Sequence, residues 1–162
     1  MKNLVVYSSK TGNTEKLAKA LYDFLPGEKE IYPVTEAPDP NDYTFVAIGF
    51  WVKNGEPDPD TQAYLKKIQE DHEVFLFATH GAKTDSEEAK KAMKKAEELG
   101  KKGRIVGMFH CLGEVPQDVI EQARNMSPPP AWLAEAEGAK GHPDSKDIEE
   151  MLHLMESIDL PL

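Results

Sequence analysis

Hydrophobic residues in this chain fall into short continuous runs, separated by stretches in which apolar positions recur with a helical period. Four runs, residues 4–7, 43–49, 74–78 and 105–109, are mostly apolar. Strands buried on both faces have this pattern, as parallel strands covered by helices do. A weaker run at residues 30–34 contains Pro33, which predicts an edge strand because proline cannot donate a ladder hydrogen bond.

Helices are predicted between these strands from the spacing of apolar residues and from capping signals. Residues 15–25 carry leucines on one face, and the Pro-Gly pair that follows ends the helix. Residues 84–87 form a capping box for a helix that runs to residue 100. Further helices are expected over residues 58–70, 116–123 and 147–158. Only eight residues, 35–42, join the second strand to the third, which is too few for a helical crossover.

This order of elements predicts an α/β fold with a doubly wound, five-stranded parallel sheet, strand order 2-1-3-4-5 and helices on both faces. In such sheets, ligands bind beyond the carboxyl ends of the strands, at the switch between strands one and three. The loops after residues 7, 49 and 78 are therefore expected to converge on one site. The chain, residues 1–162, is expected to form one domain, in which the proline-containing segment 113–144 is less typical.

The loop after the first strand has the composition of an anion site. Backbone N–H groups at a helix start lack internal partners, and the helix dipole adds partial positive charge there. Gly12 permits close approach of the backbone, while Thr11 and Thr14 can donate hydroxyl hydrogen bonds. A simple helix cap with a tight turn would use the same residue types. The favoured prediction is a phosphate site made by Ser9, Lys10, Thr11, Gly12, Asn13 and Thr14.

The sequence of this loop differs from two common nucleotide-binding motifs. The sequence lacks both Gly-x-x-x-x-Gly-Lys-Ser/Thr and Gly-x-Gly-x-x-Gly at this position. Residues 9–14, Ser-Lys-Thr-Gly-Asn-Thr, resemble instead the phosphate loop of flavodoxins, Thr/Ser-x-Thr-Gly-x-Thr, which directly follows a first strand. In that family the loop holds the phosphate of FMN, so the resemblance implies FMN as the cofactor. Lys10 departs from the usual pattern, because flavodoxins generally hold this dianion with neutral donors.

The second loop begins with an aromatic pair that suits stacking on a flat ring. The resemblance implies that this loop forms one wall of the isoalloxazine site, with Trp51 as the preferred stacking residue and Phe50 as the second. Side-chain alternation predicts that at least one of the two belongs to the core. Asn54-Gly55 could supply the peptide that accepts a hydrogen bond from reduced flavin N5, and an ordinary turn is an equal alternative. The predicted contacts are Phe50, Trp51, Val52, Lys53, Asn54 and Gly55.

The third loop supplies a glycine and a histidine where the flavin pyrimidine edge is expected. His80 could meet that edge, and backbone N–H groups after it could donate to flavin N1. The predicted contacts are Thr79, His80, Gly81 and Ala82. Gly-Phe-Trp-Val after the third strand and Thr-x-Gly-Ala after the fourth are similar to a branch of short, single-domain flavodoxin-like proteins. Some members of that branch are associated with flavin, iron–sulfur or bile-pigment reductases.

Composition and charge narrow the expected partners and location. The 162 residues are 40% hydrophobic and 30% charged, which is typical of a soluble globular protein. No apolar run approaches the roughly 20 residues of a membrane helix, so no membrane partner is expected. The net charge of −10 argues against nucleic acid. A single cysteine, Cys111, cannot form an internal disulfide and favours the reducing cytoplasm.

The sequence points to flavin chemistry rather than to catalytic side chains. No catalytic residue and no metal ligand is predicted, because acid–base pairs, triads and zinc-type spacings do not stand out. His80 and His110 are nevertheless expected to lie close together, since they end neighbouring strands.

The preferred function is an electron carrier that relays electrons one at a time between redox protein partners. Its docking surface would consist of acidic residues near the flavin edge, although two of them could simply cap helices: Glu56, Asp58, Asp60 and Asp85. The alternatives are a flavin-dependent reductase or an electron-feeding subunit of one, and a flavin-free binding module of the same fold.

Overall fold

A single twisted sheet organises the protein. The computed structural model describes residues 2–81 and 87–158, apart from the side chain of Glu135. The five parallel strands lie in the order β2-β1-β3-β5-β6, which confirms the predicted order 2-1-3-4-5 with the Pro33 strand at one edge. Their bounds are β1 (Lys2–Tyr7), β2 (Glu28–Pro33), β3 (Phe45–Lys53), β5 (Glu73–His80) and β6 (Arg104–Leu112).

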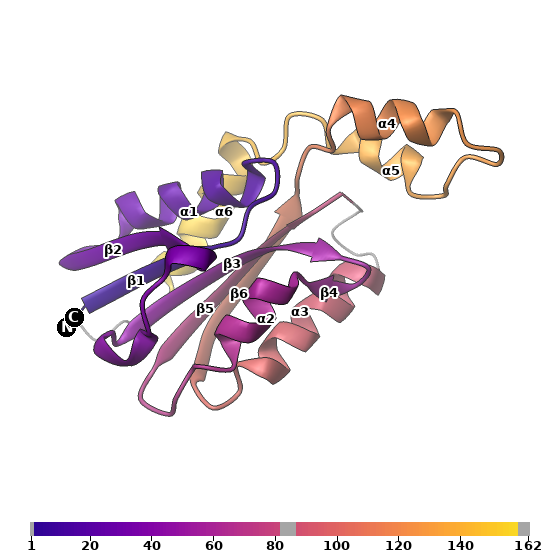
Figure 1. Ribbon diagram of the computed structural model, residues 1–162. Coiled ribbons are helices and arrows are strands. Elements are labelled where there is room, and N and C mark those ends of the chain that lie inside the picture. The colour runs from indigo at the N-terminus through magenta and orange to yellow at the C-terminus, as the bar shows by residue number, and fades with distance from the viewer. Residues whose placement is uncertain (1, 82–86, 159–162) are drawn as a thin grey trace.

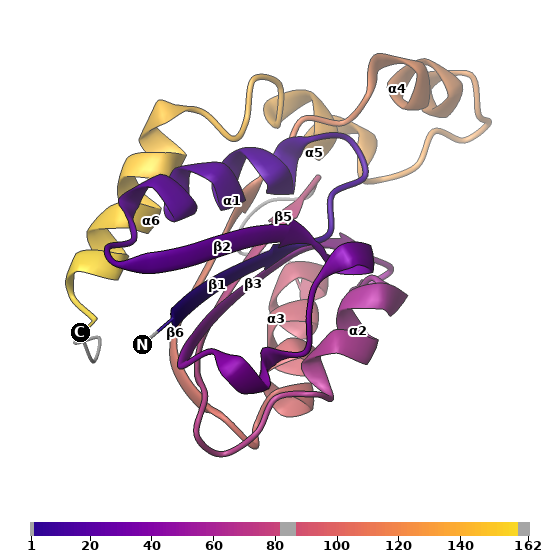
Figure 2. The ribbon, with the colours of Figure 1, turned by 60° about the vertical axis from the view of Figure 1, so that its left-hand side comes forward.

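Helices cover both faces of the sheet, as Figures 1 and 2 show. Helices α1 (Asn13–Phe24) and α6 (Ser145–Glu156) lie on one face, and α2 (Pro59–Leu65) and α3 (Glu87–Leu99) lie on the other. Two short 3-10 turns, η1 (Val34–Glu36) and η2 (Pro40–Asp42), occupy the linker between β2 and β3. Within the described ranges no helix combines the length and the apolar character that a bilayer crossing requires.

The hydrophobic core forms two layers because side chains alternate across each buried strand. Leu4 and Val6 of β1 pack toward α2 and α3, while Val5 between them packs toward α1 and α6. A Cβ atom at Gly49 would lie 2.1 Å from a ring carbon of Phe77. Glycine is therefore required where β3 passes this aromatic ring, close to the end of the strand that faces the site.

The sequence predicts the helix over residues 116–123, but it does not predict two other features at the carboxyl end of the sheet. Strand β3 continues past Gly49 to Lys53 and turns back into a two-residue antiparallel strand, β4 (Glu56–Pro57). Helices α4 (Gln117–Arg124) and α5 (Leu133–Gly138) form a hairpin that projects beyond the strand ends, shown in orange to yellow in Figure 1. We refer to residues 117–138 as the α4–α5 lobe.

Candidate functional site

The three predicted loops meet around a cavity of about 250 Å³ at the carboxyl ends of the strands. We call it the central cavity. Ten of the residues expected at the site line it: Ser9, Lys10, Thr11, Asn13, Thr14, Trp51, Val52, Thr79, His80 and Gly81. Ala82, also expected there, lies outside the described residues. The parallel register explains the convergence, because Tyr7 is paired with Gly49 and Trp51 with Thr79 at the ends of adjacent strands.

The loop before α1 has the geometry of an anion site. Gly12 occupies the N-cap position with φ of 92°, a left-handed conformation that favours glycine. Its N–H donates to Ser9 Oγ over 3.0 Å, which closes the loop. Glycine offers no side-chain oxygen to cap the helix, and no atom lies within 4 Å of where its Cβ would be. The loop therefore leaves open space beside the first amides of α1, which fits a phosphate group.

Side chains beneath this loop attach it to the sheet. Thr14 is buried, and its hydroxyl is hydrogen-bonded to that of Thr79 over 2.9 Å. Ser8 Oγ donates to Asp58 Oδ2 over 2.7 Å, and Asp58 also accepts hydrogen bonds from the N–H and hydroxyl of Thr61. The first loop is thus joined to the end of β5 and to the start of α2. Thr14 has a structural role here in addition to its place at the cavity.

The two aromatic residues of β3 face opposite sides, as strand alternation requires. Phe50 is fully buried in the core layer beneath α2 and α3, so its side chain is not available to stack on a ligand. Trp51 lines the central cavity, and the Lys10 ammonium lies 5.4 Å from the centroid of its ring. The lysine thus adds positive charge between the aromatic wall and the phosphate-type loop.

The turn between β3 and β4 lies away from the central cavity. Asn54 and Gly55 have φ values of 52° and 76°, and a Cβ atom at Gly55 would contact Lys91 of α3 at 3.3 Å. Lys53 is exposed at the end of β3. None of the three is among the described residues that line the cavity. An ordinary turn accounts for Asn54-Gly55, because the extension of β3 places this dipeptide beyond the ends of the neighbouring strands.

Two histidines pair at the edge of the cavity, as their positions on neighbouring strands predicted. His80 Nε2 and His110 Nδ1 are 3.0 Å apart, so one ring donates a hydrogen bond and the other accepts it. His80 is buried, and burial lowers the pKa of His110 from its ordinary value of 6.5. Burial therefore favours the neutral form of His110. The adjacent Cys111 is buried, and burial raises the pKa of its thiol, which agrees with a packing role.

A fourth segment, which the sequence motifs did not predict, completes the cavity. Asn13 Nδ2 donates to the carbonyl of Glu114 over 2.9 Å, and the N–H of Gly113 donates to the His80 carbonyl over 2.9 Å. A Cβ atom at Gly113 would lie 2.8 Å from Asn13 Nδ2, so a larger residue here would displace the Asn13 side chain from this hydrogen bond. The added lining residues are Gly113, Glu114, Val115, Pro116 and Val119. The sequence signal for this segment was a glycine just past the fifth strand.

Two larger hollows border the central cavity and share residues with it. One of about 630 Å³ lies between the α1 start and the α4–α5 lobe, and includes Thr11, Asn13, Ile120 and Lys140. We call it the lobe cavity. The other, of about 590 Å³, lies on the β2 side of Lys10 and Trp51. The phosphate-type loop therefore stands between spaces large enough for a cofactor and for a second molecule.

The expected acidic surface is only partly exposed. Glu56 and Asp60 lie on the surface, whereas Asp58 is 2% exposed and caps α2. The prediction of Asp58 as a docking residue is therefore wrong, and its capping alternative is right. Asp85 lies outside the described residues.

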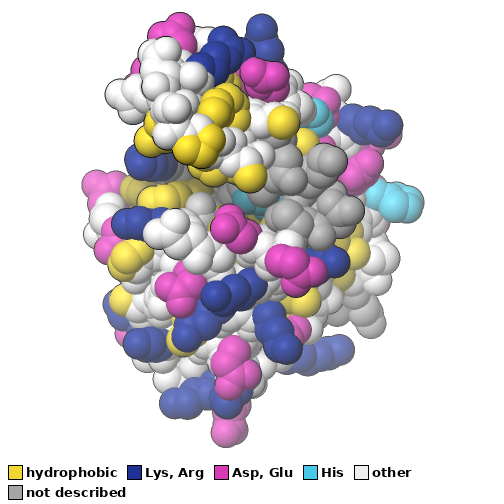
Figure 3. Space-filling model, turned by 90° about the vertical axis from the view of Figure 1, so that its right-hand side faces the viewer, with side chains coloured by type: hydrophobic (Ala, Val, Ile, Leu, Met, Phe, Trp, Pro, Cys, Tyr) yellow, Lys and Arg dark blue, Asp and Glu magenta, His cyan; other side chains and the backbone are white. Residues whose placement is uncertain are grey.

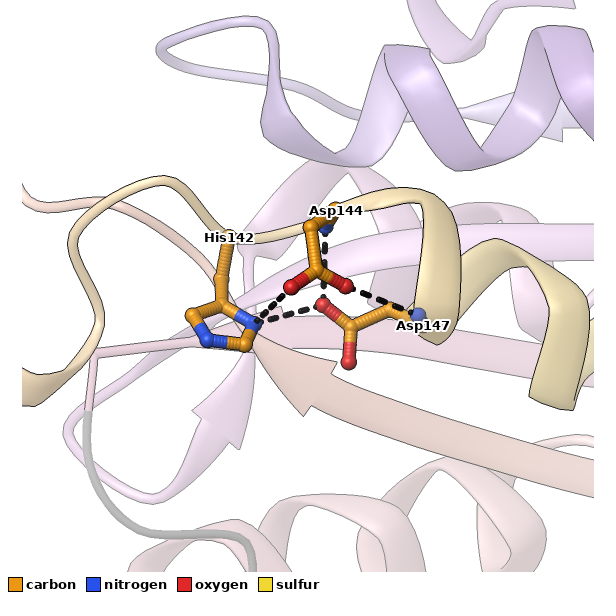
Figure 4. A group of neighbouring side chains, drawn as sticks. All are labelled: His142, Asp144 and Asp147. Atoms are coloured by element: carbon orange, nitrogen blue, oxygen red, sulfur yellow. Dashed lines mark hydrogen bonds and ion pairs between the residues drawn. The ribbon is translucent and has the colours of Figure 1, made fainter.

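His142, Asp144 and Asp147 form a compact group at the start of α6 (Figure 4), with possible ligand atoms within 4.8 Å of one another. Asp147 Oδ2 accepts hydrogen bonds from His142 Nδ1 over 2.6 Å and from the Asp144 N–H over 2.9 Å. Asp144 Oδ1 accepts two from backbone N–H groups of α6. A capping box extended by one histidine accounts for this arrangement.

A doubly wound sheet with a hydroxyl-rich loop at its switch point defines a flavodoxin-like α/β protein. The chain belongs to the flavodoxin domain family, whose model matches residues 4–156. It is 32% identical to the flavodoxin-like domain-containing protein BilS of Clostridioides difficile (strain CD3), over 93% of this chain and 92% of that one. It is 28% identical to BilS of Clostridium symbiosum, over 96% and 94% of the two chains.

Solved structures share the fold at lower sequence identity. A short-chain flavodoxin associated with a non-canonical PDU bacterial microcompartment superposes with a TM-score of 0.60 and 14% identity, covering 86% of this chain and 96% of that one. A flavoprotein from Lactobacillus acidophilus NCFM, solved in complex with FMN, gives a TM-score of 0.55 and 18% identity, covering 67% and 92%.

Proposed function

We propose that the chain binds FMN in the central cavity and the adjoining hollow on the β2 side of Trp51, and relays electrons, one at a time, between redox protein partners. The observation that carries this proposal is the convergence of the open loop before α1, the Trp51 ring and the His80–Gly81 backbone on one cavity. Membership of the flavodoxin domain family supports the choice of FMN. The complex of FMN with the Lactobacillus acidophilus flavoprotein gives further support.

The residues of the chain have distinct roles in this proposal. The hydroxyls of Ser9 and Thr11 and the first amides of α1 hold the phosphate, and Lys10 adds a positive charge. Trp51 stacks on the flavin ring, and Gly81 lets the backbone approach its edge. The hydrogen bond between His80 and His110 keeps the His80 ring beside that edge. When bound, FMN supplies the redox chemistry, because its ring accepts and releases one or two electrons.

Partners would approach through exposed carboxylates at the carboxyl end of the sheet. Glu56 and Asp60 are both exposed, and Asp60 lies beside the hollow on the β2 side of Trp51. With a net charge of −10, the protein attracts basic surfaces at low salt. Because its single cysteine is buried and unpaired, we place this function in the reducing cytoplasm.

The visible absorption spectrum of the purified protein tests the proposal. We expect flavin absorption bands, either as isolated or after addition of equimolar FMN, and anaerobic reduction followed by rapid reoxidation with ferricyanide. Quenching of free FMN fluorescence by the apoprotein gives an independent measure of binding. A protein that stays colourless and leaves FMN fluorescence unchanged would refute the proposal and would favour a flavin-free binding module.

The lobe cavity supports a second candidate, a flavin-dependent reductase or its electron-feeding subunit. This hollow shares Thr11 and Asn13 with the central cavity and has the volume of a small-molecule site. A reductase would turn over a small organic acceptor in the absence of any other protein. The test is reoxidation of the reduced protein by a panel of quinones, compared with free reduced FMN at the same concentration. Rates no faster than those of free FMN would favour the electron carrier.

A further inference from the structure

The α4–α5 lobe has an unusual distribution of apolar side chains. Its buried apolar residues are Ile120, Ala123 and Ala136, and Leu133 is half-buried. Val119, Met126 and Trp132 are 38%, 57% and 40% exposed. Burial of large apolar side chains normally stabilises a folded domain, because it removes their surface from water. The lobe therefore leaves a tryptophan and a methionine partly in solvent instead of in its core.

These residues are concentrated in one part of the molecule. Among the described residues four large hydrophobic side chains are exposed, and three of them belong to the lobe. The fourth, Met108, lies on β6. Figure 3 shows hydrophobic side chains on the lobe beside a hollow in the molecular surface. Exposed apolar groups gathered in this way mark interaction surfaces, and tryptophan and methionine are enriched at the centres of protein interfaces.

The apolar surface begins at the mouth of the proposed flavin site. Val119 lines the central cavity and is also exposed on α4. The lobe projects beyond the carboxyl ends of the strands in both ribbon views (Figures 1 and 2). A protein seated on the lobe would therefore contact the chain beside the central cavity, which is the region that electron transfer over a short distance requires.

The charge of the lobe indicates the chemistry of the partner. Arg124 is paired with Glu137 over 2.8 Å, so its charge is already compensated. The exposed acidic residues on and beside the lobe outnumber Arg124 and Lys140: Glu114, Asp118, Glu121 and Glu137. A second copy of this chain would bring like charges together, which disfavours self-association. A partner with lysines and arginines around an apolar patch would complement both features.

We propose that the α4–α5 lobe is the docking surface for a basic redox protein, with Met126 and Trp132 as its apolar anchors. The partner places an apolar patch on these side chains and its positive charges on the surrounding carboxylates. This inference rests on the proposed electron-carrier function and names the surface through which it operates.

Cytochrome c, a basic haem protein, serves as the probe. The protein is loaded with FMN, reduced anaerobically and mixed with ferric cytochrome c by stopped flow at low salt. The fully reduced flavin gives two electrons to two ferric haems, which become ferrous, and releases its protons to solvent. The variants are Met126→Ser with Trp132→Ser, and the matched control Met108→Ser, which changes a 40% exposed methionine on β6.

We expect the double variant to reduce cytochrome c at least about fivefold more slowly than the wild type, since loss of an interface anchor typically costs more than about 1 kcal/mol. The Met108→Ser control is expected to stay within about twofold. Ferricyanide, a small acceptor that needs no docking surface, should react equally with all three proteins. Circular dichroism and flavin absorption confirm that each variant is folded and loaded.

Three results would overturn the inference. The first is an equal cytochrome c rate in the double variant and the control. The second is an equal loss with ferricyanide, which would make the lobe a cover for the flavin. The third is a wild-type dimer that dissociates in the double variant during sedimentation, which would make the occupant a second copy. Titration of cytochrome c with the apoprotein measures docking without flavin, so failure of FMN binding and failure of docking are distinguished.

Discussion

Replacement of Thr11 by valine isolates the contribution of one hydroxyl to the phosphate site. The change removes a donor to the dianion and keeps the side-chain shape. A hydrogen bond to a charged group contributes about 1.5–3 kcal/mol, so the Kd for FMN should rise between about 10-fold and about 150-fold. Riboflavin lacks the phosphate, and its Kd should not change.

The structure favours Thr11 over Thr14 for this experiment. Thr11 is exposed, and its hydroxyl accepts only a 3.1 Å hydrogen bond from Asn13 among the described contacts. Thr14 is buried against Thr79, so its replacement would also leave the Thr79 hydroxyl without this partner. The free energy of unfolding of the Thr11→Val apoprotein should stay within about 0.5 kcal/mol of the wild type, as for most surface substitutions.

The assay is quenching of flavin fluorescence during titration of the apoprotein with FMN and, separately, with riboflavin. The control is Thr44→Val, which changes a half-buried threonine just before β3, at the opposite end of the sheet. If Thr11→Val weakens FMN binding no more than the control does, or weakens riboflavin binding equally, the phosphate is not held at this loop.

Three further predictions concern the ring, the surface and the histidine pair. Trp51→Ala should weaken binding of FMN and riboflavin alike by about fivefold, because an aromatic stack contributes on the order of 1 kcal/mol beyond burial. Glu56→Gln with Asp60→Asn should reduce the salt dependence of the stopped-flow rate with cytochrome c, because fewer carboxylates then attract the basic acceptor. His110→Gln should flatten the loss of stability in acid, measured by urea unfolding at pH values above and below 6.5. Burial lowers the folded-state pKa of His110, so the unfolded chain binds the proton first and wild-type stability falls as the pH drops through this range.

Each of these has a matched control in the chain. Trp132→Ala should leave flavin binding unchanged, because Trp132 does not line the central cavity; greater weakening by this change than by Trp51→Ala would reverse our placement of the ring. Glu70→Gln with Asp71→Asn alters two exposed carboxylates before β5, at the opposite end of the sheet, and should keep the wild-type salt slope. His153→Gln changes an exposed side chain and should keep the acid slope of the wild type; equal flattening would show that the buried pair is not responsible.

Local sequence signals were sufficient for the sheet and for the first loop. Continuous apolar runs mark strands covered on both faces, and Pro33 marks an edge, so the strand order followed from few alternatives. The left-handed conformation of Gly12 and the cap of α2 by Asp58 are likewise decided by residues near each other in the sequence. Such features depend on backbone conformation over a few residues, which residue type strongly restricts.

Tertiary packing decided which residues of the second loop face the cavity. The sequence predicts a loop after residue 49, but pairing of Trp51 with Thr79 extends β3 into this stretch. This extension buries Phe50, directs Trp51 to the cavity and moves Asn54 and Gly55 away. Strand length is set by the neighbouring strand as well as by local preference, so a single segment does not reveal it.

The sequence alone therefore determined the fold class, the sheet order and the position of the phosphate-type loop. Only the tertiary structure decided that Gly113 closes on Asn13 from 100 residues away and that Val119 of the α4–α5 lobe lines the central cavity. Local patterns record the conformation that a segment prefers, whereas contacts between distant segments depend on the space that the rest of the chain leaves. The reason for a glycine at position 113 becomes clear only when the side chain packed against it is known.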